Sequence, residues 1–151
     1  MAAASGPPAV MGILLGCAMV HLAAAQVVPS AWWVPDVTLV GLVLAVARTP
    51  SQWLACSLAG GLLMCAWAIR FSGPVLVGYL LLGWALQRMN KQWDATDLRV
   101  QGIATALGSL WLTLGAMWLD ELWSLALGAL AVVHVTLTVL TAMLIRRLRL
   151  L

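Results

Sequence analysis

The sequence predicts an all-α integral membrane protein, a compact bundle of six transmembrane helices forming one domain over residues 1–151. Three observations predict this class. Hydrophobic residues make up 64% of the chain and charged residues 9%, far from the balance of a soluble globular domain. Six apolar runs alternate with short polar or turn-forming segments. The basic residues stand at the ends of these runs, which argues against a nucleic-acid-binding patch.

The first predicted span covers about residues 8–28. Within it, Gly12 and Gly16 form a GxxxG pattern. Small residues four positions apart lie on one face of a helix, where another helix can approach closely.

The second predicted span, residues 34–47, is short and follows a turn that contains Trp32, Pro35 and Asp36. Paired tryptophans beside proline are typical of a membrane interface. Even counted from Trp32, the run makes only about 24 Å of helix, less than the ~30 Å hydrocarbon core. We expect this span either to sit among its neighbours or to thin the bilayer locally.

The third and fourth spans, residues 52–69 and 74–89, are joined by a turn that ends in Gly and Pro, so they should form a tight helical hairpin. Gly60 and Gly61 lie in the middle of the first arm. Because helices in lipid associate through close backbone approach, this hairpin is predicted to be the packing centre.

A polar loop is predicted from Arg88 to Arg99, followed by spans at 100–119 and 122–145. The fifth span carries Gly108 and Gly115 on roughly one face, a second candidate groove for a partner helix.

Six spans would place both termini on one side of the membrane. With that side inside, the inner segments hold seven of the eight basic residues, and the outer turns hold only Arg70. Cytoplasmic loops carry an excess of Lys and Arg, so both termini should face the cytoplasm. The tryptophans agree, because five of them fall at the outer interface: Trp32, Trp33, Trp67, Trp118 and Trp123.

The sequence contains no nucleophile elbow, zinc-protease motif, phosphate-binding loop or pair of carboxylates deep in a span, so we expect neither an enzyme nor a cofactor. The three cysteines fall inside apolar runs without a CxxC pair, which gives a metal site little support. His134, near the middle of the sixth span, is either a functional group or a neutral imidazole bonded to a neighbouring helix; we favour the second.

Arg70 stands alone among the acids of the outer turns. Either it pairs with Asp36 and ties the second span to the third, or it reaches a lipid headgroup.

The run WxPDxxLxxLxxAxxR from Trp33 to Arg48, followed by GGLLMC and then LxGYLLxG, resembles the rod shape-determining protein MreD family. Pro35-Asp36-Val37 corresponds to the family's Pro-Asp-Leu start of the second span. Gly61 to Met64 corresponds to its Gly-Leu-Leu run, with Cys65 where the family has an acid. The resemblance covers roughly residues 10–145.

This resemblance implies a non-enzymatic scaffold subunit of the bacterial cell-elongation machinery in the inner membrane. It also implies a fold similar to the substrate-binding subunits of vitamin transporters. The implied partners are a bitopic MreC-like protein and, through it, the wall-building glycosyltransferase–transpeptidase pair and MreB. A transporter substrate-binding subunit is the rival interpretation, which needs a polar, aromatic-lined outer pocket. Genomic neighbourhood would discriminate the two.

The glycine pairs lead to one further expectation. Gly60 and Gly61 should be structural, whereas a partner helix should use the face of Gly12 and Gly16 or that of Gly108 and Gly115.

Overall fold

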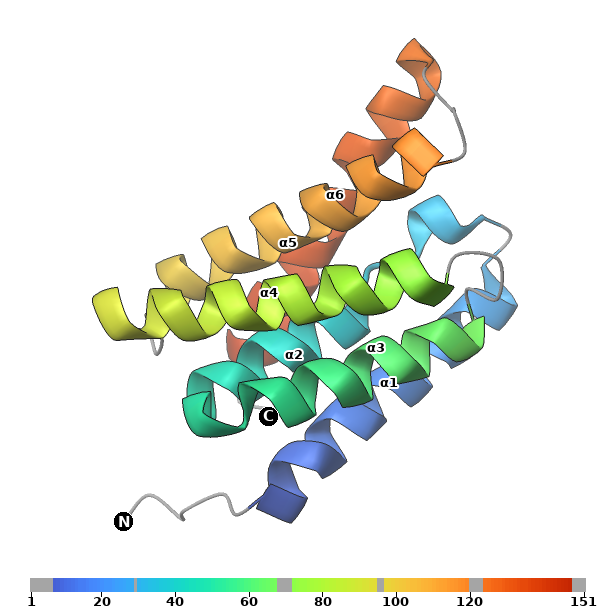
Figure 1. Cartoon of the computed structure of the whole chain (residues 1–151). Coiled ribbons are helices and arrows are strands. Elements are labelled where there is room, and N and C mark those ends of the chain that lie inside the picture. Colours follow the sequence, from blue (N-terminus) through green and yellow to red (C-terminus); the bar gives the residue numbers. More distant parts are fainter. Residues whose placement is uncertain (1–6, 29, 68–71, 95–96, 120–123, 148–151) are drawn as a thin grey trace.

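The computed structural model describes residues 7–28, 30–67, 72–94, 97–119 and 124–147, and every regular element in these ranges is helical. The α-helices are α1 (Pro7–Val27), α2 (Val37–Arg48), α3 (Trp53–Trp67), α4 (Ser72–Gln92), α5 (Leu98–Leu119) and α6 (Leu125–Arg147). Short 3-10 helices, η1 (Ala31–Trp33) and η2 (Pro50–Gln52), precede α2 and α3 (Figure 1). The predicted all-α class is thus correct.

Length and composition make three of these helices able to cross a membrane: residues Pro8–Val27 of α1, Leu98–Trp118 of α5, and α6. Helix α2 is a shorter apolar helix. The predicted loop from Arg88 to Arg99 is partly wrong, because α4 continues to Gln92. Arg, Met, Lys and Gln are good helix formers, and nothing in that stretch interrupts the backbone hydrogen bonds. Pro74, predicted in a turn, lies in the first turn of α4, where a missing N–H costs nothing.

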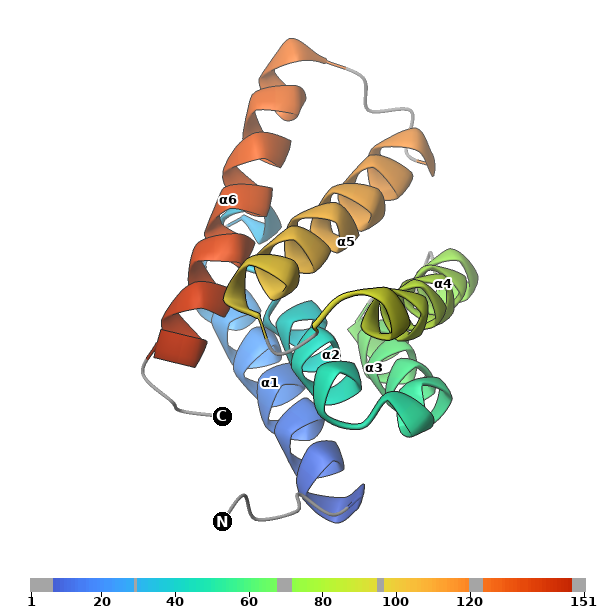
Figure 2. The ribbon, with the colours of Figure 1, turned by 90° about the vertical axis from the view of Figure 1, so that its left-hand side faces the viewer.

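The centre of the bundle is α2, not the α3–α4 hairpin that the sequence led us to expect. Every residue from Val37 to Val46 is buried, so α2 has no exposed face over that stretch. Figure 2 shows α2 between the α5–α6 pair and the α3–α4 pair, with α1 beside it. The prediction failed because small-residue faces indicate close helix pairs. A helix enclosed on all sides is marked instead by unbroken apolar sequence.

The α3–α4 hairpin is a close pair, as its glycines predicted. A β-carbon at Gly61 would lie 2.8 Å from Cδ1 of Leu76, and one at Gly83 would fall where the Ser57 side chain stands. Near the hairpin turn, the thiol of Cys65 donates to the Ser72 carbonyl at 2.9 Å. Close contact between two helices therefore depends on glycine in both of them.

The bundle buries a number of polar side chains within its apolar core and exposes many large apolar side chains. Among the described residues, nine polar ones are buried: His21, Asp36, Thr38, Ser57, Gln101, Thr105, Ser109, Thr113 and Thr138. Large apolar side chains, by contrast, cover the exterior of the outer helices, with Leu125 95% and Trp118 69% exposed. A water-soluble monomer rarely exposes so much contiguous apolar surface.

Basic residues lie at the C-terminal ends of α2, α4 and α6. Arg48 ends α2, Lys91 lies in the last turn of α4, and Arg146 and Arg147 lie in the last turn of α6. Helix α5 begins nearby along the chain with Leu98 and Arg99. Because successive helices alternate in direction, these ends share one side of the bundle with the start of α1 (Figures 1 and 2).

Candidate functional site

Asp36 directly precedes α2 and is the N-cap of that helix. Its Oδ1 accepts a hydrogen bond from the backbone N–H of Leu39 at 2.9 Å, the bond that an N-cap side chain is placed to make. The carboxylate also lies at the positive end of the helix dipole, which favours a negative charge. Asp36 is nevertheless buried, with 7% of its surface exposed. Its further partners must therefore come from other helices.

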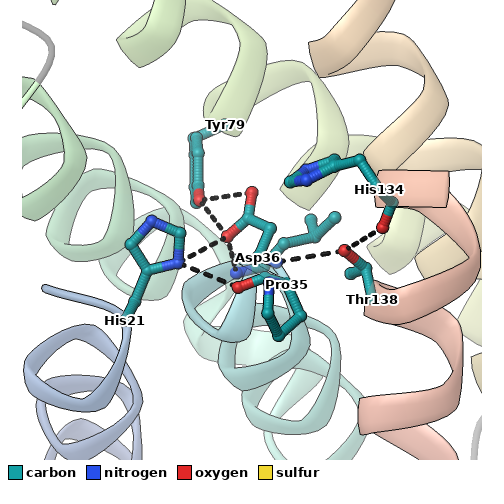
Figure 3. A network of polar contacts seen from close by, with 7 residues as sticks. His21, Pro35, Asp36, Tyr79, His134 and Thr138 are labelled. Atoms are coloured by element: carbon teal, nitrogen blue, oxygen red, sulfur yellow. Dashed lines mark hydrogen bonds and ion pairs between the residues drawn. The ribbon is translucent and has the colours of Figure 1, made fainter. Parts of the chain in front are cut away.

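Tyr79 of α4 supplies one of those partners (Figure 3). Its hydroxyl donates to Oδ1 of Asp36 at 3.3 Å and is 3.5 Å from Oδ2, and the residue is 1% exposed. The ring lies against α3, where a β-carbon at Gly60 would be 3.2 Å from its Cδ1 atom. Gly60 therefore leaves the space that the tyrosine ring occupies on its way to the carboxylate.

His21 of α1 approaches the same dipeptide from another side (Figure 3). Its Nδ1 lies 3.1 Å from the Pro35 carbonyl oxygen and 4.0 Å from Oδ1 of Asp36. The shorter distance fits an Nδ1–H that donates to the carbonyl. The Pro35 carbonyl also accepts a hydrogen bond from the backbone N–H of Val37 at 2.8 Å, so His21 is its second partner.

Thr138 of α6 completes the arrangement. The backbone N–H of Asp36 donates to Oγ1 of Thr138 at 3.0 Å, and the same hydroxyl donates to the His134 carbonyl at 2.9 Å. The His134 ring meets the Trp32 ring edge to face, with centroids 6.4 Å apart. Its Nδ1 is buried and has no hydrogen-bond partner among the described residues.

We call His21, Pro35, Asp36, Tyr79 and Thr138 the polar cluster. It joins α1, α2, α4 and α6 around the start of α2, while α3 supports the tyrosine ring. A charge in a low-dielectric interior costs several kcal/mol, so this carboxylate is retained only because hydrogen bonds and the helix dipole compensate it. Removing the Tyr79 hydroxyl would leave the carboxylate with one donor fewer, and removing the Thr138 hydroxyl would take away the acceptor of the Asp36 N–H. The cluster is suited to fixing how the helices meet.

The structure places Asp36 inside the bundle and not in an exposed turn, and its pairing with Arg70 stays a prediction. Helix α2 has 12 residues and is about 18 Å long, so its first turn starts within the bundle instead of at its surface. Arg70 lies outside the described residues.

Tyr79 is a member of the cluster that our sequence reasoning missed. It stood inside the LxGYLLxG pattern, but we gave it no role. The distance of each residue from its helix end could have identified Tyr79 as a neighbour of His21. His21 lies six residues before the end of α1, and Tyr79 lies seven residues after the start of α4. Both side chains thus lie about 10 Å from the same edge of the bundle.

The glycines expected to face a partner differ among themselves. A β-carbon at Gly12 or Gly16 would meet nothing within 4 Å. These two residues line an open groove of about 580 Å³ with Ile13, Val20 and Ile145, among others. Gly115 is also open, but Gly108 is not, because a β-carbon there would lie 3.3 Å from Leu39 and from Leu82. The expectation that Gly108 faces a partner is wrong, since α5 packs on α2 and α4 at that point.

His134 lies close to the polar cluster rather than in it. Its carbonyl is used by Thr138, and the neighbouring Thr136 and Thr141 donate to carbonyls four residues earlier in α6. In the described parts of the chain, no three His, Cys, Asp or Glu side chains stand close enough together to hold a metal ion.

Comparison of the chain with protein-family models, with curated proteins and with solved structures gave no match.

Proposed function

We propose that this protein is a six-span scaffold of the bacterial inner membrane, similar to MreD, that works by binding other membrane proteins and not by catalysis. In this proposal both termini face the cytoplasm, and the main partner is a bitopic MreC-like protein. Through that partner the scaffold would act on the glycosyltransferase–transpeptidase pair and MreB of the cell-elongation machinery.

The exposed apolar surface of the outer helices supports membrane embedding of the whole bundle. Within a bilayer, apolar side chains face lipid at no cost, and buried polar groups bond between helices. The basic helix ends support the orientation, because Arg48, Lys91, Arg146 and Arg147 share one side.

One observation carries the scaffold proposal. The Pro35-Asp36 pair, on which the resemblance to MreD depends, forms the junction at which α1, α2, α4 and α6 meet. Side chains bonded to each other in this way brace the fold and are not free to process a substrate. Binding then falls to the exterior of the bundle.

The groove along α1 is the part of that exterior best suited to a partner helix. Gly12 and Gly16 are exposed and have no neighbour that a side chain would touch. Small residues four apart let a second helix approach closely enough for its backbone to make contact. Flanking Met11, Leu15 and Met19 are exposed as well and would pack against its side chains.

Co-purification tests this assignment. The tagged protein is co-expressed with the MreC-like protein of the same genome and captured in mild detergent. We expect Gly12→Leu combined with Gly16→Leu to reduce recovery of the partner strongly while the thermal stability of the scaffold stays unchanged. Gly128→Leu, on α6, is the matched control, because that glycine also has no neighbour within 4 Å. If the double variant recovers as much partner as the wild type, the α1 groove is not the binding site. If the wild type recovers no partner, the MreC-like protein is not the partner.

The transporter alternative receives less support. Its substrate would need hydrogen-bonding groups in an accessible pocket. The α1 groove and a second groove between α4 and α5 are lined by apolar side chains and glycine.

A further inference from the structure

The second groove lies between α4 and α5 and has a volume of about 480 Å³. The two helices meet where Gly78 faces Leu112 and where Leu82 faces Gly108. Beside that crossing their side chains separate and leave the groove. Its lining is wholly apolar: Leu81, Leu82, Trp84, Ala85, Leu107, Leu110, Trp111 and Leu114.

Bulky side chains form the walls of this groove. Trp84 is 48% exposed and Trp111 58% exposed, and the leucines between them are similarly open. A partner helix would be held away by such side chains, because close helix packing needs small residues at the contact. Flexible hydrocarbon chains adapt to an uneven apolar wall. The shape of this groove therefore favours acyl chains over a helix. The α1 groove, which is lined by small residues, favours a helix.

A positive charge stands at one end of the groove. Arg88 follows Trp84 by four residues on α4, so it continues the face that lines the groove. Its guanidinium carbon lies 5.4 Å from the centroid of the Trp84 ring, within the range of a cation–π contact. The contact holds the exposed guanidinium against Trp84, a wall of the groove, while its N–H groups can still bind. A guanidinium in this position matches the oxygens of a phosphate.

We propose that the α4–α5 groove binds an anionic phospholipid, with its acyl chains against Leu81, Leu107 and Leu110 and its phosphate on Arg88. The proposal depends on membrane embedding, a part of the proposed function, but not on the scaffold role or the MreC-like partner. Since Arg88 lies toward the basic helix ends, the lipid belongs to the leaflet on that side, the inner one in the proposed orientation.

Lipid retention tests the proposal directly. The full chain is reconstituted in nanodiscs that contain phosphatidylcholine and phosphatidylglycerol, then transferred to detergent, and native mass spectrometry measures the lipid that stays bound. We expect the wild type to retain phosphatidylglycerol in preference to phosphatidylcholine. Arg88→Gln should lower the affinity for phosphatidylglycerol about fivefold, the effect of one basic residue at a membrane surface. Arg147→Gln, the same charge change on exposed α6 surface away from the groove, should leave it unchanged.

A second variant examines the acyl-chain part of the site. Ala85→Phe places a ring in the groove and should reduce retention of both lipids, with unfolding curves confirming that the bundle stays folded. If Arg88→Gln retains as much phosphatidylglycerol as Arg147→Gln, or if the two lipids are retained equally by the wild type, the proposal is wrong. A dimer or a bound polypeptide that Ala85→Phe abolishes would overturn it as well, by giving the groove a different occupant. Labelling of the helix ends, described below, decides membrane embedding separately.

Discussion

Tyr79 and Asp36 lie 43 residues apart in the chain, and the tyrosine hydroxyl donates to the aspartate carboxylate at 3.3 Å. The bond joins α4 to the first turn of α2 inside the bundle. It uses the only tyrosine of the sequence. Because Gly60 makes room for the ring and Leu39 holds the same carboxylate, the bond depends on three helices being in place together.

Removing the Tyr79 hydroxyl should destabilise the protein. Tyr79→Phe keeps the ring but leaves the Asp36 carboxylate short of a donor, so the free energy of unfolding in detergent should fall by roughly 1–3 kcal/mol. Asp36→Asn should also be destabilising. If the two groups interact, the double variant should lose less than the sum of the single losses, with a coupling of roughly 0.5–3 kcal/mol. Additive losses would show that the hydroxyl and the carboxylate do not interact in the folded protein.

Leucine at Gly61 should disturb the α3–α4 pair. A β-carbon there already comes within 2.8 Å of Leu76, so a full side chain must force the helices apart. Overpacking of this kind costs about 1–3 kcal/mol, and we expect a lower yield and a lower melting temperature in detergent. Gly128→Leu serves as the control, since it adds the same side chain where nothing lies within 4 Å. Equal melting temperatures for the two variants would contradict the close packing of this hairpin.

Two glycines of α5 offer a matched pair. Gly108→Leu should destabilise the bundle, because Leu39 and Leu82 stand 3.3 Å from the position of its β-carbon. Gly115→Leu, two turns further along the same helix, adds the same atoms where no neighbour lies within 4 Å. Thermal unfolding in detergent should separate the two by about 1–3 kcal/mol. The opposite order of stability would mean that α5 is rotated relative to the arrangement described here.

Cysteine labelling tests the proposed orientation. After replacement of Cys17, Cys56 and Cys65, single cysteines are introduced at Lys91 and at Ser124, both exposed positions. An impermeant thiol reagent added to intact cells should label Ser124→Cys and spare Lys91→Cys, because the basic helix ends are expected inside.

Permeabilised cells provide the control, since both cysteines should then react. Labelling of Lys91→Cys from outside would reverse the orientation. Labelling of both positions from outside would contradict six spans.

Composition and apolar run length were enough to predict an all-α protein and the approximate position of each α-helix in the described residues. They were enough because helices in lipid must satisfy their own backbone hydrogen bonds, so long apolar runs have few alternatives. Helix ends were less accurate, as the extension of α4 past Arg88 shows. Polar residues at the edge of a membrane continue a helix as readily as they end it.

The polar cluster could be predicted only in part. The Asp36 side chain was recognisable as a significant polar group, but its partners lie on helices whose rotation the sequence does not reveal. Periodicity along a helix indicates a buried face only when the opposite face is polar, and in this chain both faces are apolar. For the same reason the sequence predicted the same role, contact with a partner helix, for Gly12 and Gly108. In the structure Gly12 faces outward, whereas Gly108 packs against α2.

The enclosed position of α2 has a consequence for how the protein is made. The helix is synthesised second, yet α4, α5 and α6, which together with α1 and α3 surround it, emerge later. Until Tyr79 and Thr138 have been added, Asp36 stands at the start of a short helix without two of its partners. A chain truncated after α3 should therefore be degraded faster than the full chain in pulse–chase measurements. The last helices to be made hold the middle of the bundle in place.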